Sequence, residues 1–366
     1  MSGAAEIVVV GAGCVGASVA YRLAQRGARV TVLDQAAPGG GTSSASFAWT
    51  NSFSKTPRDY HDLNVASMEE HTALAKELPG GGGWLHQEGA LAWEDSAAGR
   101  ARLEQAIARL DGWGYAIARI TPAQAREIEP DLHIAPTVAT VVWTPDEGYL
   151  EAVAYVGAVL AAARRHGARV LGGRRVVEIL RAGDRVLGVR AEDGERFEAQ
   201  AVVDCAGVAA GEIAGLAGLA LPLDRVPGRL VYTAPVATTL RRPIHAPGVH
   251  FRPDGGGRIV LAEGAHDQVW RETAEAWPAE RSLAVAAIHL PALAGARVEA
   301  TRVGVRPMPR DERPMVGAIP GLEGFYVVVS HSGVTLGPLW GRIAAAELLD
   351  GVSDPRLAPY RPARFL

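Results

Sequence analysis

Near its N-terminus the chain reads Ile7-Val8-Val9-Val10-Gly11-Ala12-Gly13-Cys14-Val15-Gly16, and this stretch decides the fold. Four consecutive β-branched residues predict a buried central strand, and a G-x-G-x-x-G turn follows them directly. Residues 17–24 then place apolar side chains at helical spacing, and a second apolar strand, residues 29–33, ends in Asp34. Strand, glycine turn, helix, strand and acid follow one another in the order that a dinucleotide-binding site requires.

Each glycine of this turn has a physical task. Gly11 allows the chain to turn sharply out of the strand, Gly13 lets a diphosphate approach the backbone, and Gly16 lets the helix pack close to the sheet. The start of the helix offers unpaired N–H groups and a partial positive charge to the diphosphate. Asp34 stands where a carboxylate can accept hydrogen bonds from ribose hydroxyl groups.

The composition is that of a globular protein with more than one domain. The chain has 366 residues, of which 48% are hydrophobic and 21% are charged, and its formal net charge is -3. This length usually exceeds what one hydrophobic core serves, so we expect two domains. The charge indicates no nucleic-acid partner, and no apolar run reaches the roughly 18 residues of a membrane span. Since no basic stretch precedes the first apolar segment, we expect no signal peptide and a cytoplasmic protein.

The chain contains two cysteines, Cys14 and Cys205, and both lie next to predicted strands. We therefore expect them to be small core residues rather than parts of a disulfide framework or a cysteine-rich metal site. The sequence suggests no metal ligands.

A second glycine-rich segment follows the Asp34 strand and reads Gly40-Gly41-Thr42-Ser43-Ser44-Ala45-Ser46. From its residues alone it can be a polar linker or a cradle for phosphate and ribityl groups. Its sequence and position resemble the FAD loop of the D-amino-acid oxidase superfamily, which includes glycine oxidase, sarcosine oxidase and D-amino-acid dehydrogenases. The resemblance covers nearly the whole chain in order. It implies that the segment after the loop passes the flavin ring, which would place near that ring Phe47, Ala48, Trp49 and Asn51.

The resemblance implies an α/β fold in which a Rossmann-like FAD-binding domain carries a second, antiparallel-sheet (α+β) substrate domain, as in glycine oxidase. We expect residues 1–79, 146–220 and 304–366 in the FAD-binding domain, and residues 80–145 and 221–303 in the substrate domain. Apolar spacing predicts helices over 58–78, 97–110 and 280–287, a helix that follows Leu150 and ends at Arg165, and a helix start at Thr121-Pro122. Strands are predicted around 90–93, 138–143, 170–180, 185–191, 197–204, 230–233, 249–252, 258–262 and 325–329.

A third cofactor segment is expected at Gly333–Pro338, where a loop opens a C-terminal helix that extends to about residue 349. Backbone N–H groups and the helix dipole could there stabilise negative charge on a reduced flavin, although a plain strand-to-helix turn is the alternative. The resemblance also implies that the backbone at Val176 or Val177 contacts the adenine end. The predicted cofactor-binding residues are Gly11, Gly13, Cys14, Val15, Gly16, Asp34, Gln35, Gly41, Thr42, Ser43, Ser44, Ser46, Phe47, Ala48, Val176, Val177, Ala206, Gly207, Gly304, Arg306, Gly333, Val334, Thr335 and Leu336.

Substrate anchoring is predicted at Arg306. The segment Gly304-Val305-Arg306-Pro307 resembles the one in which glycine oxidase and its relatives hold the substrate carboxylate by an arginine. A guanidinium group suits this task because its donors form a planar fork that matches a carboxylate. The alternative for Arg306 is a surface or inter-domain salt bridge.

Two features depart from the superfamily pattern. Glycine oxidase carries a second arginine in the loop that here contains His331 and Ser332. Covalent sarcosine oxidases attach their flavin through a cysteine in the C-terminal part, and no cysteine lies beyond Cys205 here. We therefore expect FAD to be bound non-covalently.

Other candidate catalytic residues follow from strand periodicity and loop position. His250 and Arg252 face the same side of a predicted strand, and with Arg306 they would suit a substrate with a second anionic group; a solvent-facing basic pair is the alternative. Lys55 lies near the expected flavin edge, where a cation can aid oxygen reduction, unless it is simply a solvated lysine. The predicted catalytic residues are Arg306, His250, Arg252, Trp49, His331 and Lys55.

The expected reaction is FAD-dependent oxidation of an amine or amino acid. Hydride transfer from the carbon next to nitrogen would give an imine that water hydrolyses, and oxygen would be reduced to hydrogen peroxide. An N-substituted glycine is preferred slightly over a primary amino acid. Three alternatives stay open: a 2-hydroxy-acid oxidase that uses His250 or His331 as its base, a flavoprotein subunit that depends on a partner, and a nicotinamide dehydrogenase. The sequence also leaves open the electron acceptor, the stereochemistry and the oligomeric state.

Overall fold

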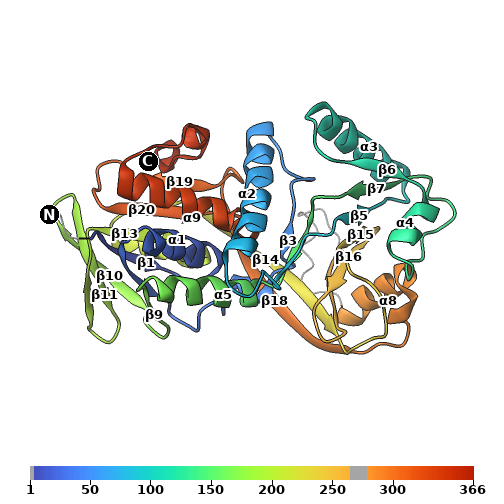
Figure 1. Cartoon of the computed structure of the whole chain (residues 1–366), viewed down its shortest axis with the longest axis horizontal. Helices are drawn as coiled ribbons and strands as arrows, with labels where there is room; N and C mark the ends of the chain where they lie inside the picture. The colour runs from blue at the N-terminus through green and yellow to red at the C-terminus, as the bar shows by residue number, and fades with distance from the viewer. Residues whose placement is uncertain (1–3, 264–277) are drawn as a thin grey trace.

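The computed structural model describes residues 4–263 and 278–366 and shows two lobes side by side (Figure 1). One lobe carries both termini, and the other is built from the middle of the chain. The long strands β14 (Leu223–Thr233) and β18 (Val298–Pro309) lie where the two lobes meet, and they pair with each other along their length.

The first lobe is built on a six-stranded sheet in the order β19-β20-β13-β1-β2-β9. Its strands are β1 (Glu6–Val10), β2 (Arg29–Leu33), β9 (Arg169–Leu171), β13 (Ala201–Asp204), β19 (Met315–Ala318) and β20 (Phe325–Val329). Neighbouring strands are parallel except β19, which is antiparallel to β20. Ile7 and Val9 pack into the core on one face, and Val8 and Val10 pack into the core on the other. Burial on both faces explains why β1 is apolar along its length.

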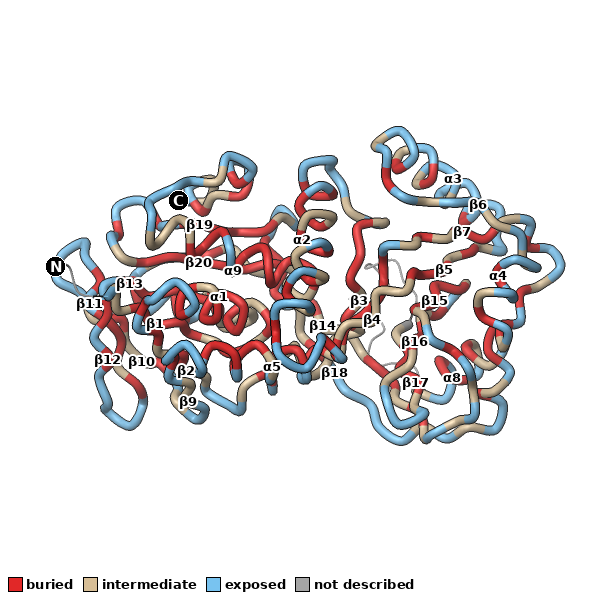
Figure 2. Tube along the Cα trace, in the orientation of Figure 1, coloured by how far each residue is buried: buried red, intermediate tan, exposed pale blue. Residues whose placement is uncertain are grey.

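Helices cover one face of this sheet and a smaller sheet covers the other. The helical face carries α1 (Cys14–Gln25), α5 (Ala152–Arg165) and α9 (Gly333–Asp350), which share one core. The opposite face carries α6 (Ala210–Leu216) and the three-stranded meander β10 (Val176–Ala182), β11 (Arg185–Ala191) and β12 (Arg196–Glu198). Figure 2 shows the central strands and α1 buried along most of their length. The expected Rossmann-like α/β architecture is confirmed.

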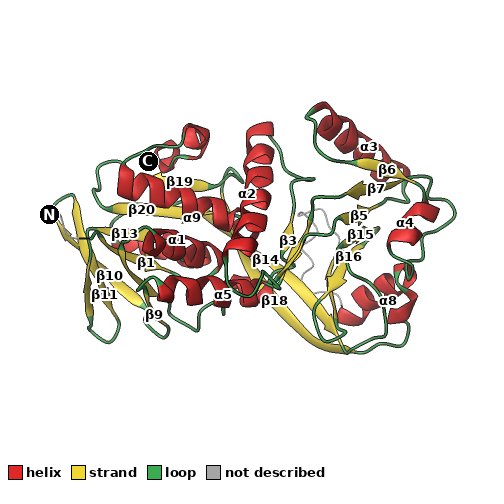
Figure 3. Ribbon diagram, viewed as in Figure 1, coloured by secondary structure: helices red, strands yellow, loops and turns green. Residues whose placement is uncertain are grey.

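The second lobe contains an eight-stranded sheet in the order β18-β14-β17-β16-β15-β5-β7-β6. Its shorter strands are β5 (Ala90–Ala92), β6 (Ala118–Ile120), β7 (Val141–Thr144), β15 (Ile244–Ala246), β16 (Val249–Pro253) and β17 (Ile259–Glu263). The sheet is antiparallel apart from the β15–β5 pair. The helices around it are α3 (Ala97–Gly112), α4 (Pro122–Ile128) and α8 (Ala279–His289) (Figure 3).

Alternation along the strands gives this sheet an apolar face and a polar face. Val231, Phe251 and Leu261 belong to the core that includes residues of α8. Because side chains alternate along a strand, residues one position away, such as His250 and Arg252, lie on the other face. That face looks toward the first lobe, since the Arg252 Nε donates to the Phe47 carbonyl oxygen at 2.6 Å.

The remaining elements lie between the lobes or at the chain end. Helix α2 (Arg58–Glu77) stands between the lobes in Figure 1 and packs against α9. A small sheet joins β3 (Trp49–Thr50), β8 (Gly148–Leu150) and β4 (Leu85–His86). The 3-10 turns are η1 (Thr42–Ala45), η2 (Gly207–Ala209), η3 (Pro291–Leu293), η4 (Pro355–Tyr360) and η5 (Pro362–Phe365).

Several predicted elements differ from the observed ones. The expected strand 170–180 is divided into β9 and β10, which belong to different sheets, because the chain turns at Gly172-Gly173, where Gly173 has φ +67°. The expected strand 197–204 is likewise divided into β12 and β13, and strand 138–143 begins only at Val141. The segment 333–338, expected as a loop before a helix, forms the first turns of α9. The predicted helix start at Thr121-Pro122 is confirmed, with a complete capping box.

The division into domains remains a proposal. Its boundary between residues 303 and 304 falls inside β18. Within the described residues, no helix has both the length and the apolar character needed to cross a membrane.

Candidate active site

At the first glycine turn, backbone atoms approach so closely that only glycine fits. Gly11 has φ +100°, and a Cβ built on it would lie 2.5 Å from the Cys205 carbonyl oxygen. A Cβ on Gly16 would lie 1.9 Å from the Gly11 carbonyl oxygen, so α1 packs directly onto the turn. Burial raises the pKa of the Cys14 thiol to about 11 and that of Cys205 well above its usual value, which agrees with the expectation that both are core residues.

The Asp34 carboxylate binds the backbone of the glycine turn and also faces a cavity. Its Oδ2 accepts a hydrogen bond from the Ala12 N–H at 2.7 Å, and its Oδ1 accepts one from Ala36 at 2.8 Å. The carboxylate also borders a cavity of about 190 Å³, whose walls include Gln35, Val176, Val177 and Ala206. The residues predicted for the adenosine end therefore do come together. A carboxylate oxygen can accept more than one hydrogen bond, so Asp34 can hold ribose hydroxyl groups and the turn together.

We call residues 40–49 the cofactor loop. It crosses β18 at Gly304, where an added Cβ would lie 2.1 Å from the Ala45 carbonyl oxygen. On either side of the crossing, the Thr42 Oγ1 donates to the Val305 carbonyl oxygen at 2.7 Å, and the Arg302 Nη1 donates to that of Ser44 at 3.0 Å. The loop is thus held against the second lobe and is not a free linker.

The ends of the cofactor loop face the starts of two helices. The Cys14 N–H at the start of α1 donates to the Ser43 Oγ at 3.2 Å. At the start of α9, the Thr335 Oγ1 donates to the Trp49 carbonyl oxygen at 3.2 Å. Ala48, whose N–H donates to the Ser46 Oγ at 3.0 Å, has φ +55°, which is uncommon for a residue with a side chain. The fold therefore brings the glycine turn, the cofactor loop and the start of α9 together.

Helix α2 braces the start of α9 through a polar stripe that the sequence reading missed. The His71 Nε2 donates to the Val334 and Thr335 carbonyl oxygens at 3.0 and 3.1 Å, and the Ser67 Oγ donates to that of Thr335 at 2.7 Å. The Tyr60 hydroxyl donates to the Ser332 Oγ at 2.8 Å. Burial lowers the pKa of His71 to about 4, so it acts as a neutral donor. Polar residues at helical spacing on a buried face were the available signal.

Arg306 lies just beyond the loop crossing and forms a cluster with two other predicted residues. Burial, together with the nearby charges of Lys55 and Arg306, lowers the pKa of His331 to about 3. His331 is therefore neutral at ordinary pH, and both cations are near enough to act on its pKa. The sequence placed these three residues in separate segments, and the fold brings them together.

A buried glutamate that was not predicted positions the turn before Lys55. The Glu147 Oε1 accepts hydrogen bonds from the Ser52 N–H at 2.8 Å, the Phe53 N–H at 2.6 Å and the Tyr115 hydroxyl at 2.8 Å. Burial raises the pKa of Glu147 to about 7, against the opposing effect of these hydrogen bonds and of Lys55. An acid beside Gly148 gave no sign of this role, because its partners lie far away in the sequence.

His250 is half of a histidine pair. Its Nδ1 lies 2.9 Å from that of His245, so one Nδ1 donates and the other accepts. Burial lowers the pKa of His250 to about 4 and that of His245 well below its usual value. The Trp49 ring lies against His245, with ring centroids 3.8 Å apart. His245 was missed, although it stands directly opposite His250 in the hairpin.

Arg252 makes no hydrogen bond to this histidine pair and binds other partners instead. Besides its bond to Phe47, its Nη1 donates to the Pro253 carbonyl oxygen at 2.5 Å and to the Asp254 Oδ1 at 3.2 Å. Its guanidinium lies 4.8 Å from the centre of the Tyr149 ring. Arg252 lines a second cavity next to the cofactor loop, whereas Arg306 does not. This arrangement favours a role in holding the loop over the predicted role in substrate binding.

The remaining predicted residues lie along the same path. Gly333 lies against Val15, since a Cβ on the glycine would approach the valine Cγ2 to 3.1 Å. Gly13 lies against Ser43 in the same way, at 3.1 Å from its Oγ. Gly41 precedes η1, Gly207 begins η2 with φ +58°, and Leu336 is fully buried in α9. Among the described residues, no group of three or more His, Cys, Asp or Glu side chains is arranged to hold a metal ion.

Comparison with known proteins agrees with this geometry. Residues 6–347 match the family described as FAD dependent oxidoreductase (DAO). The chain is 29% identical to the oxidoreductase YurR of Bacillus subtilis, over 98% of this chain and 99% of that protein. It is 27% identical to glycine oxidase of Geobacillus kaustophilus, over 99% of this chain and 97% of that protein. The crystal structure of a glycine oxidase from Geobacillus kaustophilus superimposes with a TM-score of 0.86 and 26% identity, covering 99% of this chain and 100% of that one.

Proposed function

The chain belongs to the FAD dependent oxidoreductase (DAO) family, and on this premise we propose that it oxidises an amino acid, with an N-substituted glycine as the preferred substrate class. It is an FAD-dependent oxidoreductase for amine or amino-acid substrates. The finer proposal concerns the substrate, the residues that bind it and the reduction of oxygen to hydrogen peroxide.

The residues present fit FAD. The glycine turn leaves open backbone at the start of α1, where the helix dipole favours a diphosphate. Asp34 and the cavity beside it suit the adenosine end. The cofactor loop, β18 and the start of α9 would surround the flavin ring. When bound, FAD supplies the acceptor for a hydride from the substrate carbon.

The substrate proposal depends on the location of Arg306. It is partly buried, lies beside the crossing of the cofactor loop and β18, and is close enough to His331 to lower the pKa of that imidazole. A carboxylate held there by a guanidinium fork would keep the neighbouring carbon in one position, which hydride transfer requires.

The same cations would favour the reactive form of the substrate. An amine must lose its extra proton before its carbon can give up a hydride. Burial and nearby positive charge both disfavour protonation, and together they lower the pKa of the His331 imidazole at this position. Arg306 and Lys55 would therefore lower the pKa of a bound ammonium group, and its proton would pass to water.

The histidines favour an amine over a 2-hydroxy acid. Oxidation of an alcohol needs a base for the hydroxyl proton. The pKa of His331 is lowered to about 3 and that of His250 to about 4, which makes both weak bases. A neutral amine requires no such base. Water would hydrolyse the imine product, and Lys55 would attract the negative charge that forms when oxygen is reduced.

Anaerobic titration of the purified holoenzyme tests this proposal. N-alkyl glycines, primary D- and L-amino acids, and 2-hydroxy acids are added in turn while the visible flavin absorption is recorded. We expect bleaching by an N-alkyl glycine, and weaker or slower bleaching by primary amino acids. Bleaching by a 2-hydroxy acid alone would overturn the amine proposal. Peroxide formed after readmission of air, measured with a coupled peroxidase, tests oxygen as the acceptor.

A further inference from the structure

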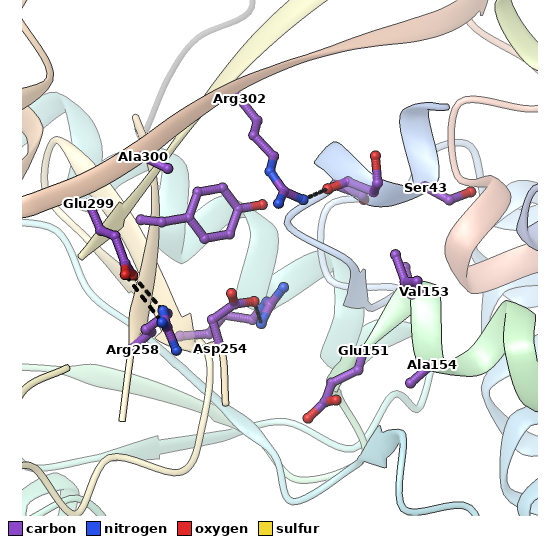
Figure 4. Close-up of a pocket in the computed structure, with 14 residues that line it drawn as sticks. Ser43, Glu151, Val153, Ala154, Asp254, Arg258, Glu299, Ala300 and Arg302 are labelled. Atoms are coloured by element: carbon purple, nitrogen blue, oxygen red, sulfur yellow. Dashed lines mark hydrogen bonds and ion pairs between the residues drawn. The ribbon is translucent and has the colours of Figure 1, made fainter. Parts of the chain in front are cut away.

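A cavity of about 720 Å³ lies behind the cofactor loop (Figure 4). Its walls come from the loop, from the start of α5 and from the polar face of the eight-stranded sheet. The lining residues are Ser43, Ser44, Ser46, Glu151, Ala152, Val153, Ala154, Tyr232, Arg252, Asp254, Arg258, Glu299, Ala300 and Arg302.

The loop crossing separates this cavity from the candidate active site. Arg302, Gly304 and Arg306 lie on the same face of β18, because side chains alternate along a strand. The cofactor loop covers that face at Gly304. Arg302 borders the cavity on one side of the crossing, and Arg306 lies on the other side and does not line it. No residue of the glycine turn or of the segment 331–336 lines it either.

The start of α5 opens into the cavity without a side-chain cap. Glu151 stands at the N-cap position, but it makes no capping hydrogen bond; its Oε1 instead lies 3.3 Å from the His86 Nε2. Figure 4 shows the Glu151 carboxylate directed away from Ser43 and Arg302. The first residues of the helix, Ala152–Ala154, line the cavity, and N–H groups in a first helical turn lack partners within the helix. This end of the helix therefore offers donors and a partial positive charge.

Three arginines and three carboxylates line the cavity, and two of the arginines form ion pairs with lining carboxylates. Asp254 pairs with Arg252 at 3.2 Å, and Glu299 pairs with Arg258 at 2.5 Å. Arg302 has no carboxylate partner among the described residues; it donates to the Ser44 carbonyl oxygen and lies 5.3 Å from the centre of the Tyr232 ring.

Arg252 adds a buried donor to the same wall. Its side chain is only 4% exposed, yet it lines the cavity. Its Nε and Nη1 bind the chain, whereas its Nη2 makes no hydrogen bond to the part of the protein that the structure describes. An arginine on a cavity wall whose Nη2 makes no hydrogen bond to the described residues suits a ligand with acceptor oxygens.

We propose that this cavity binds a small molecule that carries a phosphate group. Arg302, the Ser46 hydroxyl and the start of α5 would hold the phosphate, with Arg252 on the same wall. Guanidinium, hydroxyl and helix N–H donors are the set that phosphate oxygens require. The remainder of the ligand would lie along Tyr232. The site shares the cofactor loop with the active site but none of the residues proposed to bind substrate.

Calorimetric titration of the holoenzyme with inorganic phosphate and with phenyl phosphate tests the site without turnover. We expect one molecule of either probe per chain, with phenyl phosphate bound more tightly because its ring can pack on Tyr232. The Arg302→Gln variant should weaken both probes by about tenfold, since it removes a charge-assisted contact. Arg310→Gln, at the exposed position directly after the same strand, is the matched control and should bind as the wild type does.

A second pair of variants tests the helix start. Val153 is 52% exposed, so neither Val153→Asp nor Val153→Asn should disturb the fold. The aspartate should repel phosphate at the helix start, whereas the asparagine of the same shape should bind it nearly as the wild type does. Absence of binding to the wild type would overturn the proposal. So would binding that survives Arg302→Gln but is lost in Arg306→Lys, because the probe would then occupy the substrate position.

Discussion

The Gly304→Ala substitution tests whether the cofactor loop must cross β18 at this glycine for FAD to bind. A Cβ at position 304 would lie 2.1 Å from the Ala45 carbonyl oxygen, whereas carbon–oxygen contacts normally begin near about 3.3 Å. The obstacle is backbone and cannot rotate away. The loop would therefore have to retreat from β18 by about 1 Å.

The expected loss of FAD affinity can be estimated from the contacts that break when the loop moves away from β18. Two hydrogen bonds flank the crossing: Thr42 to Val305 at 2.7 Å and Arg302 to Ser44 at 3.0 Å. Each contributes about 1 kcal/mol, and forcing a methyl group into a packed site costs about 1–3 kcal/mol. Together these losses amount to about 3–5 kcal/mol. If they fall on the conformation that binds the cofactor, FAD binding should weaken by about 100-fold or more.

The assay is a titration of apoprotein with FAD, followed by the change in flavin fluorescence, together with thermal unfolding of the apoprotein. Gly157→Ala is the matched control, because Gly157 lies exposed within α5 and a Cβ there meets nothing within 4 Å. This control should keep the wild-type FAD affinity and gain up to about 1 kcal/mol in stability. If Gly304→Ala bound FAD with the wild-type Kd, the crossing would not hold the cofactor site together, and the reasoning would be refuted.

Three further predictions concern the residues around the site. Arg306→Lys should raise the KM for an amino-acid substrate by about tenfold or more while flavin content stays normal, because a lysine cannot form the bidentate fork; an unchanged KM would remove Arg306 from substrate binding. Lys55→Met should slow the reaction of reduced enzyme with oxygen in stopped flow and leave anaerobic reduction within about twofold, and slowing of the reductive step alone would contradict the oxygen role. Glu147→Gln should remove a pH dependence of stability. The pKa of Glu147 is raised from 4.5 to about 7 in the folded protein, so protonation stabilises the fold; this contribution is complete below pH 4.5 and is lost as pH rises through 7. The free energy of unfolding of the wild type should gain up to about 3 kcal/mol relative to the variant between pH 7 and pH 4.5, as measured by urea unfolding, and parallel curves would show that Glu147 does not titrate in this range.

The sequence was sufficient for the parts of the site that lie close together along the chain. The strand from Ile7, the glycine turn and Asp34 form one local unit, and the predicted strand over residues 29–33 matches β2 residue for residue. Val176 and Val177 were assigned to the adenosine end only through the family resemblance, and both line the cavity beside Asp34. Strand periodicity correctly placed His250 and Arg252 on one face. It could not predict that Arg252 would donate a hydrogen bond to Phe47.

The residues that sequence reasoning missed act across long distances in the chain. Glu147 binds the backbone of Ser52 and Phe53, 95 and 94 positions away, and His71 binds Val334, 263 positions away. A pattern of apolar spacing records which face of an element is buried and does not record its partner. Buried polar residues must find hydrogen-bond partners, so a polar stripe inside a helical pattern indicates that a partner exists without identifying it.

The interlocking of the cofactor loop with β18 has a consequence for assembly. The Thr42–Val305 hydrogen bond joins positions 263 residues apart, and the strand that carries Val305 belongs to the sheet of the other lobe. The wall of the cofactor site is therefore complete only when the first and last parts of the chain have both folded. The residues at the adenosine end, by contrast, all belong to the first lobe: Asp34 accepts hydrogen bonds from Ala12 and Ala36, and the cavity beside it is walled by Val176, Val177 and Ala206. The adenosine end of FAD should consequently find a formed site earlier than the flavin end, and tight retention of FAD should require both lobes.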